Sequence, residues 1–177
     1  MKKTVLKWEI GGIFFVFLLG ALLHFVFEWS GNSPFVGAIA SVNESVWEHF
    51  KQAFWPMAIF AAIEYPFIRK YIGNFFTGKA IAIYMMPLLE SLIFYTYTAF
   101  TGKEILIVDI LSFLVAAILA QFTSYKIITA GFRVRRYANY ISLAFIVILG
   151  LVLILFTFFP PHFPVLLDPE TGKYGIP

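Results

Sequence analysis

Long apolar segments alternate with short polar ones along most of the chain, and the apolar segments have the length of membrane-spanning helices. A helix needs about 20 apolar residues to cross the hydrocarbon core of a bilayer. Segments that contain glycine, proline or charged residues separate them. The pattern predicts an all-α, polytopic membrane protein with a bundle of about five transmembrane helices. The expected spans cover residues 10–28, 50–69, 80–100, 105–125 and 140–159.

The second expected span differs from the others because a polar segment leads into it. Ser41 and Glu44 have the S-x-x-E spacing of a capping box, which predicts that a helix begins at Ser41. We therefore expect an interfacial helix start over residues 41–50. Residues 160–177 are rich in proline and glycine and are expected to form an outer tail. These segments predict a single transmembrane domain over residues 1–177.

Composition supports lipid as the outer solvent. The chain is 60% hydrophobic and only 13% charged, whereas a typical soluble domain has about 25% charged residues. No cysteine is present, which excludes disulfides, thiolate catalysis and cysteine-ligated metal sites. The net charge of +3 is small and gives no reason to expect a nucleic-acid partner.

The distribution of basic residues orients the expected spans. With the N-terminus in the cytoplasm, ten Lys and Arg residues fall in inner segments and three in outer segments. The inner residues are Lys2, Lys3, Lys7, Arg69, Lys70, Lys79, Lys126, Arg133, Arg135 and Arg136, and the outer ones are Lys51, Lys103 and Lys173. The positive-inside rule then predicts the N-terminus inside and the C-terminus outside a cytoplasmic membrane. The first apolar run lacks a convincing cleavage site and is expected to be retained.

Ionisable side chains gather at the expected outer ends of the first two spans. Burying such a group in a membrane costs several kcal/mol, so each is by default a candidate for a functional site. His24 and Glu28 are four residues apart, as are Glu44 and Glu48, so each pair should share a helix face. Two carboxylates one turn apart repel each other, and a shared proton, Lys51 or a bound cation should offset the repulsion. Imidazole and carboxylate groups bind divalent metals. These four residues are the expected ligands of Zn, Mn or Mg.

Two further acids are the expected catalytic residues. Glu90 lies near the middle of the third span with no basic residue nearby in the sequence, and Asp109 lies about one turn into the fourth. Either could transfer protons as a general acid or base. The expected substrate contacts or supporting residues are Asn43, Trp47, His49, Glu64, His162 and Asp168.

Each of these residues also has a structural interpretation. Glu44 could only close its capping box, and His24 and Glu28 could extend to water from the interface. Glu48 could pair with Lys51 on a solvated surface. His162 fits an ordinary loop residue. Glu64 could pair with the basic residues that follow the second span or with those at 126–136.

Three segments resemble a known family. They are "HFVFEWSGNSPFVG" (24–37), "SVNESVWEHFKQAFWPM" (41–57) and "PPHFPVLLDPETGKYGI" (160–176). Together they resemble an uncharacterised family of small prokaryotic multi-pass membrane proteins with an NESxWEH motif. The resemblance covers the first third of the chain and the tail, and the middle spans match only in hydropathy. It implies a bacterial or archaeal cell membrane and no particular activity.

Three functions fit these features. The first is an outward-facing His/Glu site of a metal-dependent hydrolase that acts on or binds a lipid-like or small molecule. The second is a transporter of a small molecule, an ion or protons, in which Glu64 and Glu90 mark a path and a homodimer supplies enough helices. The third is a non-catalytic accessory or binding subunit. The chain contains no nucleotide-binding loop, nucleophile elbow or H-E-x-x-H motif.

Overall fold

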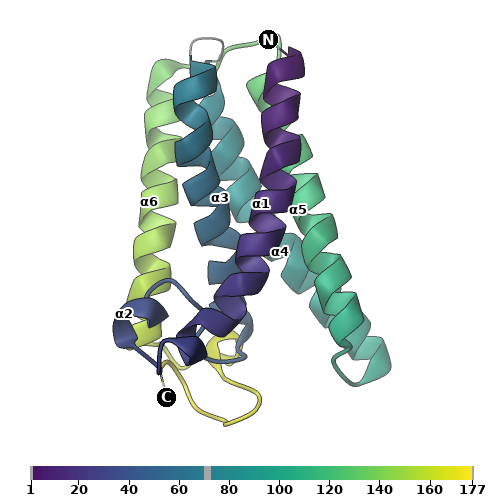
Figure 1. Ribbon diagram of the computed structural model, residues 1–177, viewed down its shortest axis with the longest axis vertical. Coiled ribbons are helices and arrows are strands. Elements are labelled where there is room, and N and C mark those ends of the chain that lie inside the picture. The colour runs from purple at the N-terminus through teal and green to yellow at the C-terminus, as the bar shows by residue number, and fades with distance from the viewer. Residues whose placement is uncertain (1, 70–72, 177) are drawn as a thin grey trace.

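The computed structural model describes residues 2–69 and 73–176, which are all-helical and contain no strand. The helices are α1 (Lys2–Trp29), α2 (Pro34–Gly37), α3 (Val46–Ile68), α4 (Phe75–Thr101), α5 (Leu106–Ile128), α6 (Arg136–Phe158) and the short 3-10 helix η2 (Pro164–Leu166). The long helices run side by side in one bundle, and the tail folds back over one end of it (Figure 1). The all-α prediction is confirmed.

Four helices, α1, α4, α5 and α6, are long and apolar enough to cross a membrane. The remaining expected span, residues 50–69, corresponds to α3, whose polar side chains lower its hydropathy. These side chains do not face outward: Glu48, Lys51, Gln52 and Glu64 are all buried. The cause is the position of α3, which packs against α1, α4 and α6. A helix in the interior of a bundle can carry polar groups that a lipid-facing helix cannot.

Helix α3 begins at Val46, five residues later than the spacing of Ser41 and Glu44 indicates. A second S-x-x-E pair explains the difference: Ser45 is the N-cap and its side chain accepts a hydrogen bond from the backbone N–H of Glu48. Ser41 is buried ahead of the helix and donates to the backbone oxygen of Glu48 at 3.0 Å. Residues 41–45 are therefore an extended connection and not the start of an interfacial helix.

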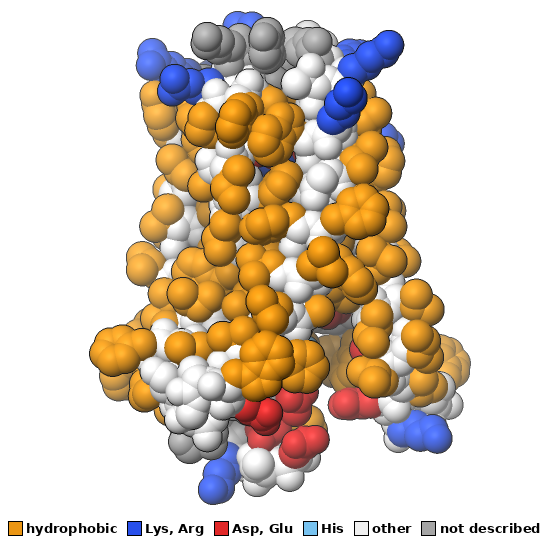
Figure 2. All heavy atoms as spheres, viewed as in Figure 1, with side chains coloured by type: hydrophobic (Ala, Val, Ile, Leu, Met, Phe, Trp, Pro, Cys, Tyr) orange, Lys and Arg blue, Asp and Glu red, His pale blue; other side chains and the backbone are white. Residues whose placement is uncertain are grey.

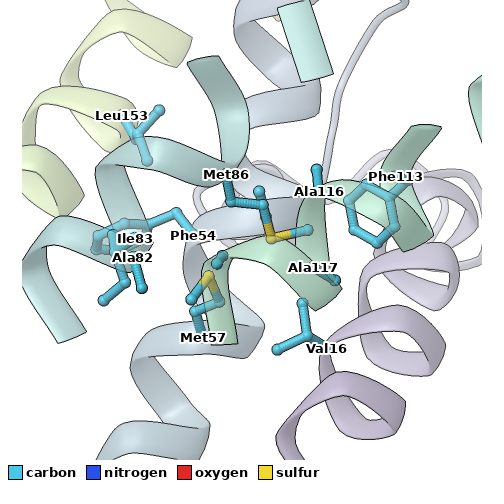
Figure 3. Close-up of a cluster of buried hydrophobic side chains, with 12 residues drawn as sticks. Val16, Phe54, Met57, Ala82, Ile83, Met86, Phe113, Ala116, Ala117 and Leu153 are labelled. Atoms are coloured by element: carbon cyan, nitrogen blue, oxygen red, sulfur yellow. The ribbon is translucent and has the colours of Figure 1, made fainter. Parts of the chain in front are cut away.

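The core combines alanine and methionine side chains with some larger ones, while many other large apolar side chains face outward. Its buried members come from all five long helices (Figure 3) and are Val16, Ala53, Phe54, Met57, Ala82, Ile83, Met86, Phe113, Ala116, Ala117, Ala120 and Leu153. Exposed side chains such as Phe14, Leu18 and Leu151 cover the outside of the bundle. Small residues between helices and large apolar residues outside are typical of membrane bundles. Figure 2 shows this apolar band, with Lys and Arg side chains gathered at the N-terminal end.

A close approach of helices at Gly20 gives the first testable prediction. A Cβ atom at Gly20 would lie 2.5 Å from the Phe113 ring and 2.8 Å from the backbone oxygen of Gln52. We expect Gly20→Ala to lower the free energy of unfolding by about 1–3 kcal/mol, because the added methyl overpacks the interface. Gly11→Ala is the matched control, since its nearest neighbour would be 3.9 Å away. Equal thermal unfolding of the two variants in detergent would contradict this packing.

A buried ionic cluster joins three helices near the N-terminal end of the bundle. The Lys79 ammonium lies 2.8 Å from a carboxylate oxygen of Glu9 and 2.6 Å from one of Glu64. Ser124 donates a hydrogen bond to the other oxygen of Glu9 at 2.8 Å. All three charged side chains are at most 2% exposed. Glu64 thus pairs with Lys79, which was expected in an inner turn. It does not pair with the basic residues that follow the second span or with those at 126–136, as the structural interpretation had it.

Candidate functional site

Two histidines and a glutamate meet at the end of the bundle opposite the Lys79 cluster. His24 comes from the last turns of α1, His49 from the first turn of α3, and Glu44 from the extended connection before α3. Each offers one ligand atom, and these atoms all lie within 4.8 Å of one another. The three side chains are only partly shielded from solvent. This group, His24–Glu44–His49, could hold a metal ion.

The two imidazoles present the same nitrogen to the carboxylate. Nε2 of His24 lies 3.7 Å from Glu44 Oε1, and Nε2 of His49 lies 3.5 Å from Glu44 Oε2. In a tetrahedral zinc site, bonds of about 2.0–2.2 Å place neighbouring ligand atoms about 3.3 Å apart. Small side-chain movements would therefore bring the three groups onto one ion.

Hydrogen bonds on the other ring nitrogens hold these orientations. Nδ1 of His49 lies 2.9 Å from the backbone oxygen of Ser45, so it can donate there and leave the Nε2 lone pair free. Metal-binding histidines usually donate the N–H of the second nitrogen to such an acceptor, which fixes the ring and its tautomer. His24 differs, because its Nδ1 lies 3.0 Å from the side-chain amide nitrogen of Gln52, which can only donate and which also donates to Ser41 Oγ at 2.9 Å. His24 could bind a metal through Nε2 once the Gln52 amide turns its oxygen toward Nδ1.

The three-residue group lines a cavity of about 170 Å³. The cavity lies between α1 and α3 on one side and the ends of α4 and α5 that meet near residues 101–106 on the other. Those ends diverge from the rest of the bundle (Figure 1), and acidic side chains surround the resulting notch (Figure 2). The lining residues are His24, Glu44, Val46, His49, Phe50, Glu90, Ser91, Phe94, Glu104, Leu106, Asp109 and Ser112.

The two acids expected from the sequence to be catalytic line this same cavity. Oε2 of Glu90 and Oγ of Ser91 are buried and have no hydrogen-bond partner in the described structure. Asp109 Oδ1 accepts a 2.6 Å hydrogen bond from the Tyr97 hydroxyl. Glu104, on the turn before α5, also lines the cavity and was missed by the sequence reasoning. Its exposed position in a polar turn gave no signal of a site.

Two expected metal ligands are not brought to the three-residue group. Glu28 is exposed and does not line the cavity. Glu48 pairs with Lys51 at 2.5 Å. This pair was expected on a solvated surface, but both side chains are buried in the interior. Because residues 41–45 are not helical, Glu44 and Glu48 do not share a helix face. The carboxylate of Glu48 instead accepts hydrogen bonds from the Val42 backbone N–H and the Thr157 hydroxyl.

The remaining expected residues act in the surrounding structure. Asn43 donates a hydrogen bond to the backbone oxygen of Gly175 at 2.8 Å, which ties the connection beside Glu44 to the tail. Trp47 packs against Phe50 and Phe156. These contacts support the segment that carries the group without adding ligands to it.

His162 and Asp168 both contact other residues of the tail. The His162 ring packs edge-on against Tyr174, with 4.6 Å between ring centroids. Asp168 accepts hydrogen bonds from the Thr171 hydroxyl and the Glu170 backbone N–H. Neither residue lines the cavity, so the described structure does not place the tail histidine over the site.

Comparison with known proteins yields one match. A family described as "Family of unknown function (DUF6512)" matches residues 1–176, well beyond the first third and the tail that carried the resemblance. No curated protein and no solved structure matches the chain. Any functional conclusion must therefore come from the geometry of the site.

Proposed function

The chain belongs to the DUF6512 family, a family of unknown function, and we propose that it is a membrane-embedded, metal-dependent hydrolase. The observation that carries the proposal is the coincidence of the His24–Glu44–His49 group with a cavity that also contains unused acids. Two histidines and a carboxylate with an open coordination position form a common catalytic zinc site. Zinc is therefore the proposed metal, with manganese and magnesium as alternatives.

The proposed topology has five spans, because α3 crosses the bundle beside the four apolar helices. We place the N-terminus in the cytoplasm and the C-terminus outside a cell membrane. The basic side chains at the N-terminal end of the bundle support this orientation (Figure 2). The proposed site then faces outward, at the depth of the outer headgroups.

Each part of the cavity has a role in the proposed reaction. A metal ion on the three-residue group would polarise a substrate carbonyl and activate a bound water. Glu90 lines the same cavity, so we assign proton transfer between that water and the leaving group to its Oε1, which leaves the unpartnered Oε2 for substrate binding. One carboxylate oxygen of Asp109 accepts a hydrogen bond from Tyr97. We therefore propose that Asp109 positions the substrate or Glu90.

The walls of the cavity favour a lipid-like substrate. Val46, Phe50, Phe94 and Leu106 supply apolar lining beside the polar groups. The notch between the diverging helix ends lies next to the apolar outer band (Figure 2). An amphiphile could therefore place its polar group on the metal while its chain remains against apolar side chains.

Metal analysis and a hydrolysis assay test the proposal together. We expect about one Zn or Mn per chain in protein purified without chelators. We also expect cleavage of a carboxylic ester or amide amphiphile that stops with chelator and returns with metal. Protein that contains no metal, and whose thermal stability does not change on adding Zn²⁺, Mn²⁺ or Mg²⁺, would overturn it.

Transport is the second candidate, because the Glu9–Lys79–Glu64 cluster adds buried ionisable groups at the inner end. However, apolar core residues such as Val16 and Met57 lie between the two polar regions along α1 and α3. A transporter, as a monomer or homodimer, would have to open this layer. Uptake into proteoliposomes that depends on Glu64, with no hydrolysis, would favour transport. Absence of both activities, with a co-purifying protein, would favour an accessory subunit.

A further inference from the structure

We infer that the α4–α5 side of the cavity is a binding subsite for an ammonium group, so that the ligand is an amine-bearing amphiphile. The inference deepens the proposed function, since it names the substrate class of the same cavity. It depends on Glu90, Glu104 and Asp109, and not on the metal-binding group.

The first argument is the charge of the lining. Three acidic side chains besides Glu44 line the cavity, namely Glu90, Glu104 and Asp109, and no Lys or Arg is among the described residues that do so. A divalent ion bound by Glu44 and the two histidines would offset only part of this charge. Negative charge left in a cavity with apolar walls is costly, and a bound cation offsets it. The same charge would repel phosphate, sulfate or carboxylate headgroups.

The second argument is the presence of buried polar atoms without partners. Oε2 of Glu90 and Oγ of Ser91 are shielded from solvent, and no hydrogen bond reaches them in the described structure. Both residues line the cavity. A buried acceptor without a donor costs free energy comparable to a lost hydrogen bond. An ammonium group supplies three donors and would satisfy both atoms.

The third argument distinguishes an ammonium group from a second metal ion. Among the described residues, only the His24–Glu44–His49 group brings three ligand atoms within 4.8 Å of one another. The acids on the other side do not bring three ligand atoms together in this way, and Asp109 is engaged by Tyr97. Separated carboxyl groups suit a larger cation that reaches each of them through its own hydrogen bond. Phe50 and Phe94 also line the cavity, and aromatic rings attract cations and can cover an attached alkyl chain.

Binding of small soluble probes tests the subsite. The probes are hexylamine, hexanol and hexanoate, which share one alkyl chain and differ in charge. Titration calorimetry is performed on the chain in uncharged phosphatidylcholine nanodiscs after treatment with chelator. We expect hexylamine to bind one per chain, at least about tenfold more tightly than hexanol or hexanoate, because charge-assisted hydrogen bonds are lost in the other two.

Variants locate the binding. Glu90→Gln and Glu104→Gln should each weaken hexylamine binding by about tenfold. The exposed turn position of Glu104 makes its replacement safe for folding. Glu28→Gln is the matched control, since Glu28 is exposed on α1 and outside the cavity. Equal binding of hexylamine and hexanol, or full binding by both cavity variants, would overturn the inference.

The two proposals can fail separately. Hexylamine binding in metal-free protein that also persists in His49→Ala would support the subsite even if the chain proved to bind no metal. Protein with bound zinc and ester or amide hydrolysis, but no preference for the amine, would leave the hydrolase standing and remove the subsite. Stoichiometric uptake of two divalent ions, with the second lost in Glu90→Gln, would also overturn the ammonium subsite.

Discussion

Replacing Lys79 with Met should lower the free energy of unfolding by about 3–5 kcal/mol, the largest stability effect that we expect in this chain. Lys79 is the only cation within salt-bridge distance of Glu9 and Glu64 in the described structure, and both acids are at most 2% exposed. Methionine matches the length of the lysine stem but supplies no charge. Two buried carboxyl groups would then lose their partner. Equilibrium unfolding in mixed detergent micelles measures the effect.

Two controls separate the loss of the charge from the loss of volume. Lys103→Met changes an exposed lysine on the turn before α5 and should alter stability by less than about 0.5 kcal/mol. Combining Lys79→Met with Glu9→Gln and Glu64→Gln should recover much of the loss, because no unpaired acid remains. If Lys79→Met proved as stable as Lys103→Met, the buried ionic cluster would be wrong.

His49→Ala should have the largest effect on the proposed activity. It removes one of three ligands, and we expect metal content to fall from about one ion per chain to near zero. Lewis-acid catalysis contributes several kcal/mol, so kcat/KM for an ester or amide amphiphile should drop about a thousandfold. Metal analysis and initial rates on the same preparation measure both effects.

His162→Ala is the control for this prediction. His162 packs on Tyr174 in the tail and does not line the cavity, so its removal should leave metal content unchanged. His24→Ala should behave like His49→Ala, since both present Nε2 to Glu44. Full metal content in both ligand variants would mean that the ion binds elsewhere.

The sequence predicted the helices well, because long apolar segments have few structural alternatives. Four of the five expected spans coincide with helices long and apolar enough to cross a membrane. The positions of helix ends were less predictable. Helix α4 begins at Phe75 and so includes Lys79, which an inspection of hydropathy places in the preceding turn. Charged residues can continue a helix when a partner in another helix pairs with them, and a hydropathy pattern does not reveal that partner.

The grouping of the polar residues was predicted in part. Their role as metal ligands stays a prediction, but the side chains of His24 and Glu44 do lie together, because His24 is near the end of one helix and Glu44 precedes the next. Glu48 was grouped with Glu44 on the assumption of a continuous helix from Ser41, and the later start at Val46 separates them. His49, expected only as a supporting residue, lies beside His24 and Glu44 where Glu48 had been expected. Two consecutive S-x-x-E patterns, at 41–44 and 45–48, cannot be distinguished without the tertiary contacts that stabilise one of them.

The hydrogen bond from Asn43 to Gly175 joins positions 132 apart in the sequence. Ile176 strengthens the join, since its backbone N–H donates to the backbone oxygen of Thr157 at the end of α6 and its side chain packs against the buried cluster that contains Val42. During biosynthesis, α1 to α5 leave the ribosome before this segment does. The connection that carries Glu44 therefore lacks its distant anchor until translation has passed residue 176.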